Sequence, residues 1–375
     1  MRGPWVVRVQ VTALEPAHLG TFRGIVERDN HCNGGSGSTL QITIGINGMC
    51  SGTLTDALGV ARFTGGFDRL PGGGLEANIS LPNHPAQLLE LTLAPNVPEV
   101  RGRAVPVGVG VSGYPLVTAF KDRSRDGFLT TRAGRYLLSH RAASTQNDVP
   151  KGAGYSIITV TSKGQATWVV HMPDGLVGTS TGWINGADQV LLHTLMAAGS
   201  RSALGQVTLS DSPLAANVDW LATGGPSRLE ITSFPLHQLQ VVGRKHTPPE
   251  IGESYFPPSL TAPVQTQFEV SAGGLLGTHA NRLTISPNAK VTWVNRPLAG
   301  HVNSLIFDRN TGLILGKIQG KTPGMTWPEV KFSGVALRDE GIVAGFFLRP
   351  NPAPGQSSVS AKLSSGLVEL KSVSP

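Results

Sequence analysis

The sequence has few charged residues and no long apolar runs. Charged residues make up 15% of its 375 residues, below the roughly 25% that is usual for globular domains. Disorder requires low hydrophobicity together with high net charge, so the 39% hydrophobic content argues against a disordered chain. No run approaches the ~18–20 apolar residues of a membrane-spanning helix. The sequence therefore predicts a folded chain without a transmembrane segment.

Cysteine is also scarce, with Cys32 and Cys50 the only two. They do not form a CxxC pair, so zinc and redox motifs have no support. Both flank predicted strand edges around a Gly-rich loop, a placement that allows a disulfide, which would indicate an oxidising compartment. Two separate buried thiols are the alternative.

No motif for catalysis, metal binding or a cofactor stands out. Residues 178–182 fit G-x-S-x-G, but a nucleophile elbow needs a strand–turn–helix context, and this serine falls inside a predicted strand. Residues 122–127 open like a calcium loop, yet Ala133 stands where a bidentate Glu is required. The sequence therefore predicts no catalytic residue, no metal site and no cofactor.

The net charge is +7, but the basic residues are scattered. The densest group is Arg123, Arg125, Arg132, Arg135 and Arg141. A nucleic-acid-binding protein usually concentrates such residues on one face and adds aromatic residues for stacking. We therefore expect a dispersed surface charge and no specific nucleic-acid partner, with adhesion to a polysaccharide or an anionic cell-surface polymer as the alternative.

The first 13 residues do not resemble a signal peptide. Val7, Val9 and Val11 alternate with polar residues, which is a strand pattern rather than a charged region followed by an apolar one. The expected explanations are a cytoplasmic protein, a removed targeting segment, or a piece of a longer chain.

What the sequence has in abundance is short alternating segments separated by Gly, Asn or Pro. Glycine occurs 47 times and proline 27 times. Alternation with a period of two indicates strands, and turns spaced about 8–12 residues apart favour a barrel or sandwich. Asn47-Gly48 is a strong hairpin signal. The clearest predicted strands cover residues 21–27, 39–46, 51–55, 60–67, 74–81 and 87–93.

The chain also contains internal repeats. Residues 20–22 match 134–136, residues 37–43 match 154–160, and residues 63–67 match 180–183, in the same order and at an offset that grows slowly from about 114. A third, weaker copy begins near Phe268. Its residues 288–293 match 163–168, although residues 332–335 also resemble 63–65, so its register stays open.

Residues 189–200 favour a helix by composition, but their counterpart in the first copy is a strand bounded by prolines. Because tertiary context overrides weak propensity, we predict a strand here.

The repeats predict tandem antiparallel modules. Residues 1–110 form a first β-meander module, 111–132 a linker or closing strand, and 133–243 a second module. Residues 244–265 form a proline-rich linker, and 266–375 a third, divergent module or the completion of the second. The predicted fold is all-β, with up-and-down, barrel-like meanders that close to remove exposed edges. A β-sandwich is the alternative.

The chain resembles uncharacterised β-repeat modules of large secreted or surface-anchored bacterial proteins. The resemblance is carried by the G-x-Y/F opening at 20–22 and 134–136, by turns that contain glycine, and by the L-G-x-V of residues 204–207. The resemblance covers about residues 18–350 and rests on structural turns. It implies a secreted or cell-surface protein and transfers no active-site residues.

Aromatic residues at repeat positions are the remaining candidates for a site. Trp168, Trp183, Trp293 and Tyr155 would either stack on a sugar or fill a core. The leading expectation for the whole chain is a non-catalytic structural or adhesive segment of an exported bacterial protein, with the three tryptophans buried. A carbohydrate- or small-ligand-binding barrel requires at least two of them to face solvent, and a hydrolase requires a cleft with catalytic groups in mutual reach.

Overall fold

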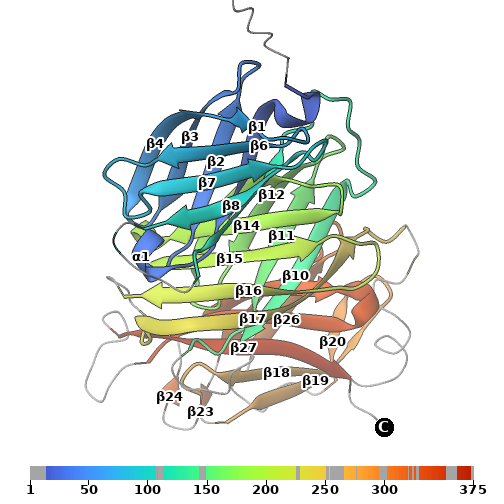
Figure 1. Cartoon of the computed structure of the whole chain (residues 1–375). Helices are drawn as coiled ribbons and strands as arrows, with labels where there is room; N and C mark the ends of the chain where they lie inside the picture. Colours follow the sequence, from blue (N-terminus) through green and yellow to red (C-terminus); the bar gives the residue numbers. More distant parts are fainter. Residues whose placement is uncertain are drawn as a thin grey trace, which may run out of the picture. The chain divides into compact units, whose positions relative to one another are not determined.

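A computed structural model describes residues 14–106, 108, 113–142, 149–224, 229–250, 253, 266–275, 277–294, 302–319, 321–322, 325–326, 329–351 and 361–372. The strand expected over residues 1–13 and most of the expected linker at 244–265 lie outside them. The chain divides into two compact units, residues 1–122 and 123–375 (Figure 1).

The first unit holds one nine-stranded sheet, barrel 1. A 3-10 turn, η1 (Pro16–His18), precedes it, and a short helix, α1 (Asn30–Asn33), follows its first strand. Its strands are β1 (Gly20–Val26), β2 (Ser38–Ile44), β3 (Met49–Asp56), β4 (Gly59–Gly66), β5 (Asp68–Arg69), β6 (Leu75–Ser80), β7 (Leu88–Leu93), β8 (Glu99–Val105) and β9 (Leu116–Lys121).

The second unit holds two eight-stranded sheets, barrel 2 and barrel 3, and a small two-stranded ribbon. Barrel 2 consists of β10 (Gly134–Ala142), β11 (Gly154–Val160), β12 (Gln165–His171), β13 (Val177–Trp183), β14 (Gln189–Met196), β15 (Arg201–Thr208), β16 (Leu214–Thr223) and β17 (Ser233–His246), with η2 (Ala197–Gly199) between β14 and β15. Barrel 3 consists of β18 (Thr266–Ala272), β19 (His279–Ile285), β20 (Val291–Trp293), β21 (Val302–Asp308), β22 (Leu313–Gln319), β25 (Val330–Leu337), β26 (Ile342–Pro350) and β27 (Leu363–Ser372), with η3 (Arg338–Glu340) before β26. The ribbon is β23 (Lys321–Thr322) with β24 (Met325–Thr326).

All three sheets follow one plan. Every strand pairs antiparallel with its neighbour, and the last strand pairs with the first: β9 with β1, β17 with β10, and β27 with β18. The sheets are therefore nearly closed, and the prediction of barrel-like antiparallel meanders is confirmed. The edges that remain lie halfway along each module, beside β4, β13 and β20.

Segments that were ambiguous in sequence supply strands of these sheets. Of the strand predicted over residues 189–200, residues 189–196 form β14 and pair along their whole length with β15, so the ladder overrides the helix-favouring composition. The remainder is wrong, because residues 197–199 form the 3-10 turn η2. The segment 111–132 contains β9, which pairs with both β1 and β8. No helix among the described residues has the length and apolar character needed to cross a membrane.

The repeat also appears in turn geometry. The turns between the second and third strands of the three barrels span residues 45–49, 161–165 and 286–290, and each closes with a hydrogen bond from its fourth residue to its first. Gly48, Gly164 and Ala289 stand at the fourth position, with positive φ angles of 79°, 82° and 59°. This turn requires a positive φ at its fourth residue alone, so Asn47 at the third position does not need one. Because the three turns hold the same place in the strand order of their barrels, residues 288–293 of the third copy are equivalent to 163–168.

Ala289 holds a left-handed conformation that suits glycine, which has no Cβ to clash with the following carbonyl. We expect Ala289→Gly to stabilise the second unit by about 0.5–1 kcal/mol. The matched change, Gly164→Ala, should destabilise it, since an added Cβ would lie 2.9 Å from Ile184 and Phe128. Urea unfolding of both variants measures the difference, and equal midpoints would contradict the equivalence of the turns.

The barrel interiors are filled by their own side chains. Phe22 lies in the core of barrel 1, Trp168 and Trp220 in that of barrel 2, and Phe268 in that of barrel 3. All four are fully buried. Within the described residues, each interior is thus a packed core, as in small barrels generally.

The first two barrels fill one equivalent space in opposite ways. In barrel 1, Gly52 lies opposite Phe63, whose ring covers the glycine so closely that an added Cβ would lie 2.4 Å from it. In barrel 2 the same cross-strand pair is Trp168 opposite Ser180. The large side chain thus lies on the third strand of barrel 2 and on the fourth strand of barrel 1.

Candidate functional site

Barrels 2 and 3 pack through outward-facing side chains. Leu137 and Tyr155 of barrel 2 contact Val335, Leu337 and Phe346 of barrel 3 in one apolar cluster. The Tyr155 and Phe346 ring centroids are 6.3 Å apart. This contact joins the two barrels into one unit.

The equivalent outward positions differ in the other barrels. The register places Arg23 and Thr39 of barrel 1 where barrel 2 has Leu137 and Tyr155. Barrel 3 has Gln267 and Ala280 there. Barrel 2 alone, among these three copies, therefore carries large apolar side chains at both positions.

Backbone and serine contacts continue this interface at the loop-bearing end of barrel 2. The Ser365 hydroxyl donates to the Pro173 carbonyl at 2.5 Å, and it accepts from the Gly152 N–H at 3.2 Å. The Glu230 N–H donates to the Leu363 carbonyl at 2.9 Å, beside a parallel bridge between Leu229 and Leu363. The loops of barrel 2 are thus bonded directly to β27.

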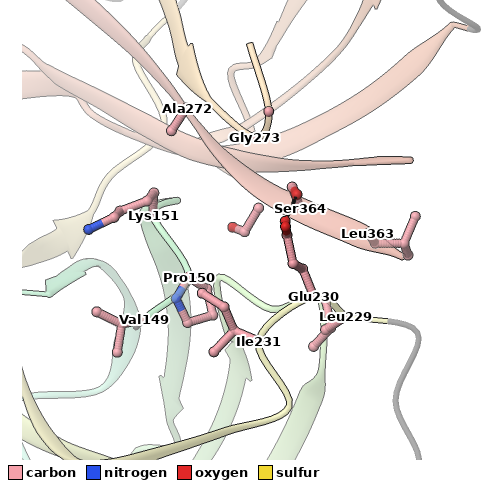
Figure 2. A pocket seen from close by; sticks show the side chains of 12 residues that line it. Val149, Pro150, Lys151, Leu229, Glu230, Ile231, Ala272, Gly273, Leu363 and Ser364 are labelled. Carbon is pink, nitrogen blue, oxygen red and sulfur yellow. Dashed lines mark hydrogen bonds between the residues drawn. The ribbon is translucent and has the colours of Figure 1, made fainter. Parts of the chain in front are cut away.

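Between these contacts lies a cavity of about 380 Å³, within the range of small-ligand sites, which runs from about 300 Å³ to about 1,000 Å³. Figure 2 shows loops of barrel 2 on one side and the strands of barrel 3 on the other. The cavity is lined by Val149, Pro150, Lys151, Leu229, Glu230, Ile231, Ala272, Gly273, Gly274, Leu363, Ser364 and Ser365.

Most of the cavity wall is aliphatic, with a few polar groups. Lys151 comes from one loop of barrel 2, and Glu230 from another, with its carboxylate accepting a hydrogen bond from the Ser364 hydroxyl. Arg349, nearly buried behind the wall, donates to the Gly274 carbonyl at 2.8 Å. Groups of both charges beside aliphatic surface suit a small polar ligand with an apolar face rather than a bare ion.

The same end of barrel 2 also buries an ion pair. Arg201 points into the barrel, is 2% exposed, and places Nε 3.4 Å from the Asp174 carboxylate. Its guanidinium also lies 5.8 Å from the Phe234 ring and donates to the Gly224 carbonyl at 2.9 Å. Burial raises the pKa of Asp174, although Arg201 and the Leu176 N–H oppose that rise.

Both charged groups of this ion pair are enclosed at the end of the barrel. A buried pair of opposite charges is costly to break, since removing one partner leaves an uncompensated charge. Among the residues that the structure describes, no three His, Cys, Asp or Glu side chains lie together in a way that could hold a metal ion.

The four aromatic residues that the sequence left as candidates for sugar stacking or core packing lie in separate places. Trp168 is buried and donates from Nε1 to the Ser156 hydroxyl at 2.7 Å. Tyr155 stacks on His171 at 4.3 Å in the barrel interface. Trp183 is half-buried on β13. Trp293 is half-buried on barrel 3, with its ring edge-on to Phe268 at 5.7 Å. The expectation that all three tryptophans are buried is therefore met by Trp168 alone.

Cys32 and Cys50 are both free and buried, the second of the two alternatives left open by the sequence. Cys32 lies in α1, with its sulfur 3.7 Å from the Ala104 carbonyl. Burial raises the pKa of the Cys32 thiol to about 12 and that of Cys50 to about 11. Both thiols are therefore protonated at neutral pH.

We expect neither thiol to react with a disulfide reagent in the native protein. At pH 8 the thiolate fraction would be about one in 10⁴ for Cys32 and about one in 10³ for Cys50, against about a quarter for an ordinary thiol. Thiol titration should count none before denaturation and two afterwards. A native thiol that reacts within minutes would contradict the buried placement.

No protein-family model matches the chain, and no curated protein is significantly similar to it.

Sequence reasoning missed both the cavity and the buried pair. Lys151, Glu230 and Ser364 come from three distant segments with no shared motif. One feature of the sequence could have indicated that Arg201 is buried. It occupies an inward position of a strand on which Ala203 and Val207 also face inward. A charge in such a row indicates a buried partner.

Proposed function

We propose that this chain is a non-catalytic structural or adhesive β-repeat segment of an exported bacterial protein. The observation that supports it most is the filled interior of all three barrels, in which Phe22, Trp168, Trp220 and Phe268 occupy the space that a ligand would need. A barrel without a binding cavity acts as a rigid module. Tandem rigid modules serve to space or to present surfaces.

Two further features fit this role. The net charge of +7 attracts the chain to anionic polymers such as those of cell envelopes. The sequence resemblance to β-repeat modules of secreted and surface-anchored bacterial proteins supplies the exported setting. Neither feature requires a reacting group.

Retention on immobilised polysaccharides tests the adhesive role. We expect the purified chain to bind alginate, an anionic polymer, and to release between about 50 and about 500 mM salt, because exposed charges are screened over that range. Neutral dextran of the same length is the control. Equal retention on both polymers, or none on alginate, would contradict adhesion through charge.

Binding of a small saccharide or similar ligand is the second candidate function, supported by the cavity between barrels 2 and 3. Its aliphatic wall would face the apolar side of a ligand, while Lys151 and Glu230 bind polar groups. We expect Ile231→Trp to fill the cavity and abolish any ligand-induced rise in melting temperature across a panel of sugars. Leu236→Trp, at an exposed site outside the lining, is the control.

A further inference from the structure

Barrel 3 carries an apolar groove on its outer face, separate from the cavity described above. The groove has a volume of about 770 Å³. Strands β21, β22, β25 and β26 supply most of its lining, which comprises Gly175, Ser304, Ile306, Leu315, Gly316, Lys317, Glu329, Val330, Lys331, Phe332, Ser333, Phe346, Phe347, Leu348 and Pro350.

One row of cross-strand neighbours crosses the face that lines this groove. Ile306 pairs with Leu315, Leu315 with Ser333, and Ser333 with Phe346. Ile306 is 62% exposed and Leu315 is 50% exposed, whereas Phe346 at the other end of the row is covered. Directly opposed aliphatic side chains stabilise a sheet when they are buried. A pair that is exposed to solvent does not gain the free energy of that burial.

No other exposed pair of this kind occurs among the described residues. Other large exposed hydrophobic residues on strands lie opposite polar or charged partners, as Val60 lies opposite Thr55 and Leu116 opposite Arg103. Single exposed aliphatic residues are ordinary, but adjacent ones that line a groove mark an interaction surface.

The groove is the uncovered part of a face that already docks a barrel. Phe346 and Leu348 belong both to the groove and to the cluster in which barrel 2 packs on barrel 3. The face thus has a demonstrated occupant over β25 and β26, which is the outer face of another barrel. Over β21 and β22, Ile306 and Leu315 are exposed among the residues that the structure describes.

We propose that this open face binds the same face of a second copy of this chain. A two-fold axis would bring the Ile306–Leu315 row of each protomer against that of its partner, which satisfies the self-complementarity that an isologous contact needs. The two sheets would then stack about 10 Å apart, as in sandwich packing.

Charge at the rim is compatible with this contact. Lys317 pairs with Glu329 at 2.9 Å, so that position is neutral, and Lys331 adds one positive charge to each protomer. The dimer should therefore be unchanged or stronger at about 500 mM salt. Adhesion to an anionic polymer weakens under the same condition, which separates the two properties.

Sedimentation equilibrium of the full chain tests the proposal. We expect a reversible monomer–dimer equilibrium. Ile306→Lys and Leu315→Glu should each raise the dissociation constant of the dimer at least about tenfold, because each places a charge in the apolar contact. Leu236→Lys, which alters an equally exposed residue on barrel 2, should leave the constant unchanged. Circular dichroism checks that every variant keeps its strand content.

Crosslinking gives a second reading that does not depend on a destabilising change. Ile306→Cys should form a covalent dimer with a bis-maleimide that spans about 10 Å, whereas Leu236→Cys should not. A wild-type chain that stays monomeric at every concentration would overturn the proposal. So would a dimer that resists both charge variants or crosslinks equally through residue 236.

Discussion

Replacing Trp168 with glycine is expected to lower the free energy of unfolding of the second unit by about 5 kcal/mol. The ring is 1% exposed and fills the core of barrel 2, and removal of a buried Trp side chain usually costs about 3–5 kcal/mol even when a methyl group remains. The change also leaves the Ser156 hydroxyl without its indole donor.

The repeat predicts how to restore this loss. In barrel 1 the equivalent pair is Gly52 opposite Phe63, so the double variant Trp168→Gly with Ser180→Phe recreates an arrangement that the chain already uses. We expect the second change to recover at least about 2 kcal/mol. Ser180→Phe alone should destabilise, because it overfills a core that already holds Trp168.

Urea unfolding of the four proteins forms a double-mutant cycle that measures this coupling. The matched control places the aromatic residue on the opposite face of the same strand, with Thr181→Phe in place of Ser180→Phe. Thr181 is exposed, so its side chain cannot reach the vacated space. Additive effects of Trp168→Gly and Ser180→Phe would contradict the equivalence of the two pairs.

Acidification is expected to destabilise the second unit through His140. This side chain on β10 is 1% exposed, and burial lowers its pKa to about 3. Its ordinary pKa in the unfolded chain is about 6.5, so between these values the unfolded state binds the proton and the folded state does not. Stability is therefore fully present above about pH 6.5 and falls as the pH decreases toward 3.

The expected loss from this residue is about 2 kcal/mol between pH 7 and pH 5. His140→Gln should remove that part of the slope, even if it lowers stability at pH 7. Equal slopes for the wild type and His140→Gln would show that His140 titrates normally in the folded protein.

Much of the fold could be predicted from sequence because its signals are local. Alternation with a period of two marks strands such as β2 and β6, and the left-handed position at Gly48 and Gly164 marks the hairpins. The third copy was harder to align because Ala289 replaces the glycine, which hides the turn although the backbone conformation is retained.

The candidate site could not be predicted because its geometry is not local. Lys151 and Ser364 are more than 200 residues apart and meet only because barrel 2 packs on barrel 3. That packing depends on Leu137 and Tyr155, which look like ordinary strand residues until the register shows them facing outward. An aromatic residue at a repeat position indicates a structural role but does not say which face of the sheet it occupies.

Hydrogen exchange of the full chain tests most directly that the last strand of each module pairs with its first to give a nearly closed barrel. We expect amides of β9, β17 and β27 to exchange as slowly as those of the central strands, because each of these last strands is bonded on both sides. Exchange of any one of them at the rate of an exposed loop would show an open sheet and contradict the account.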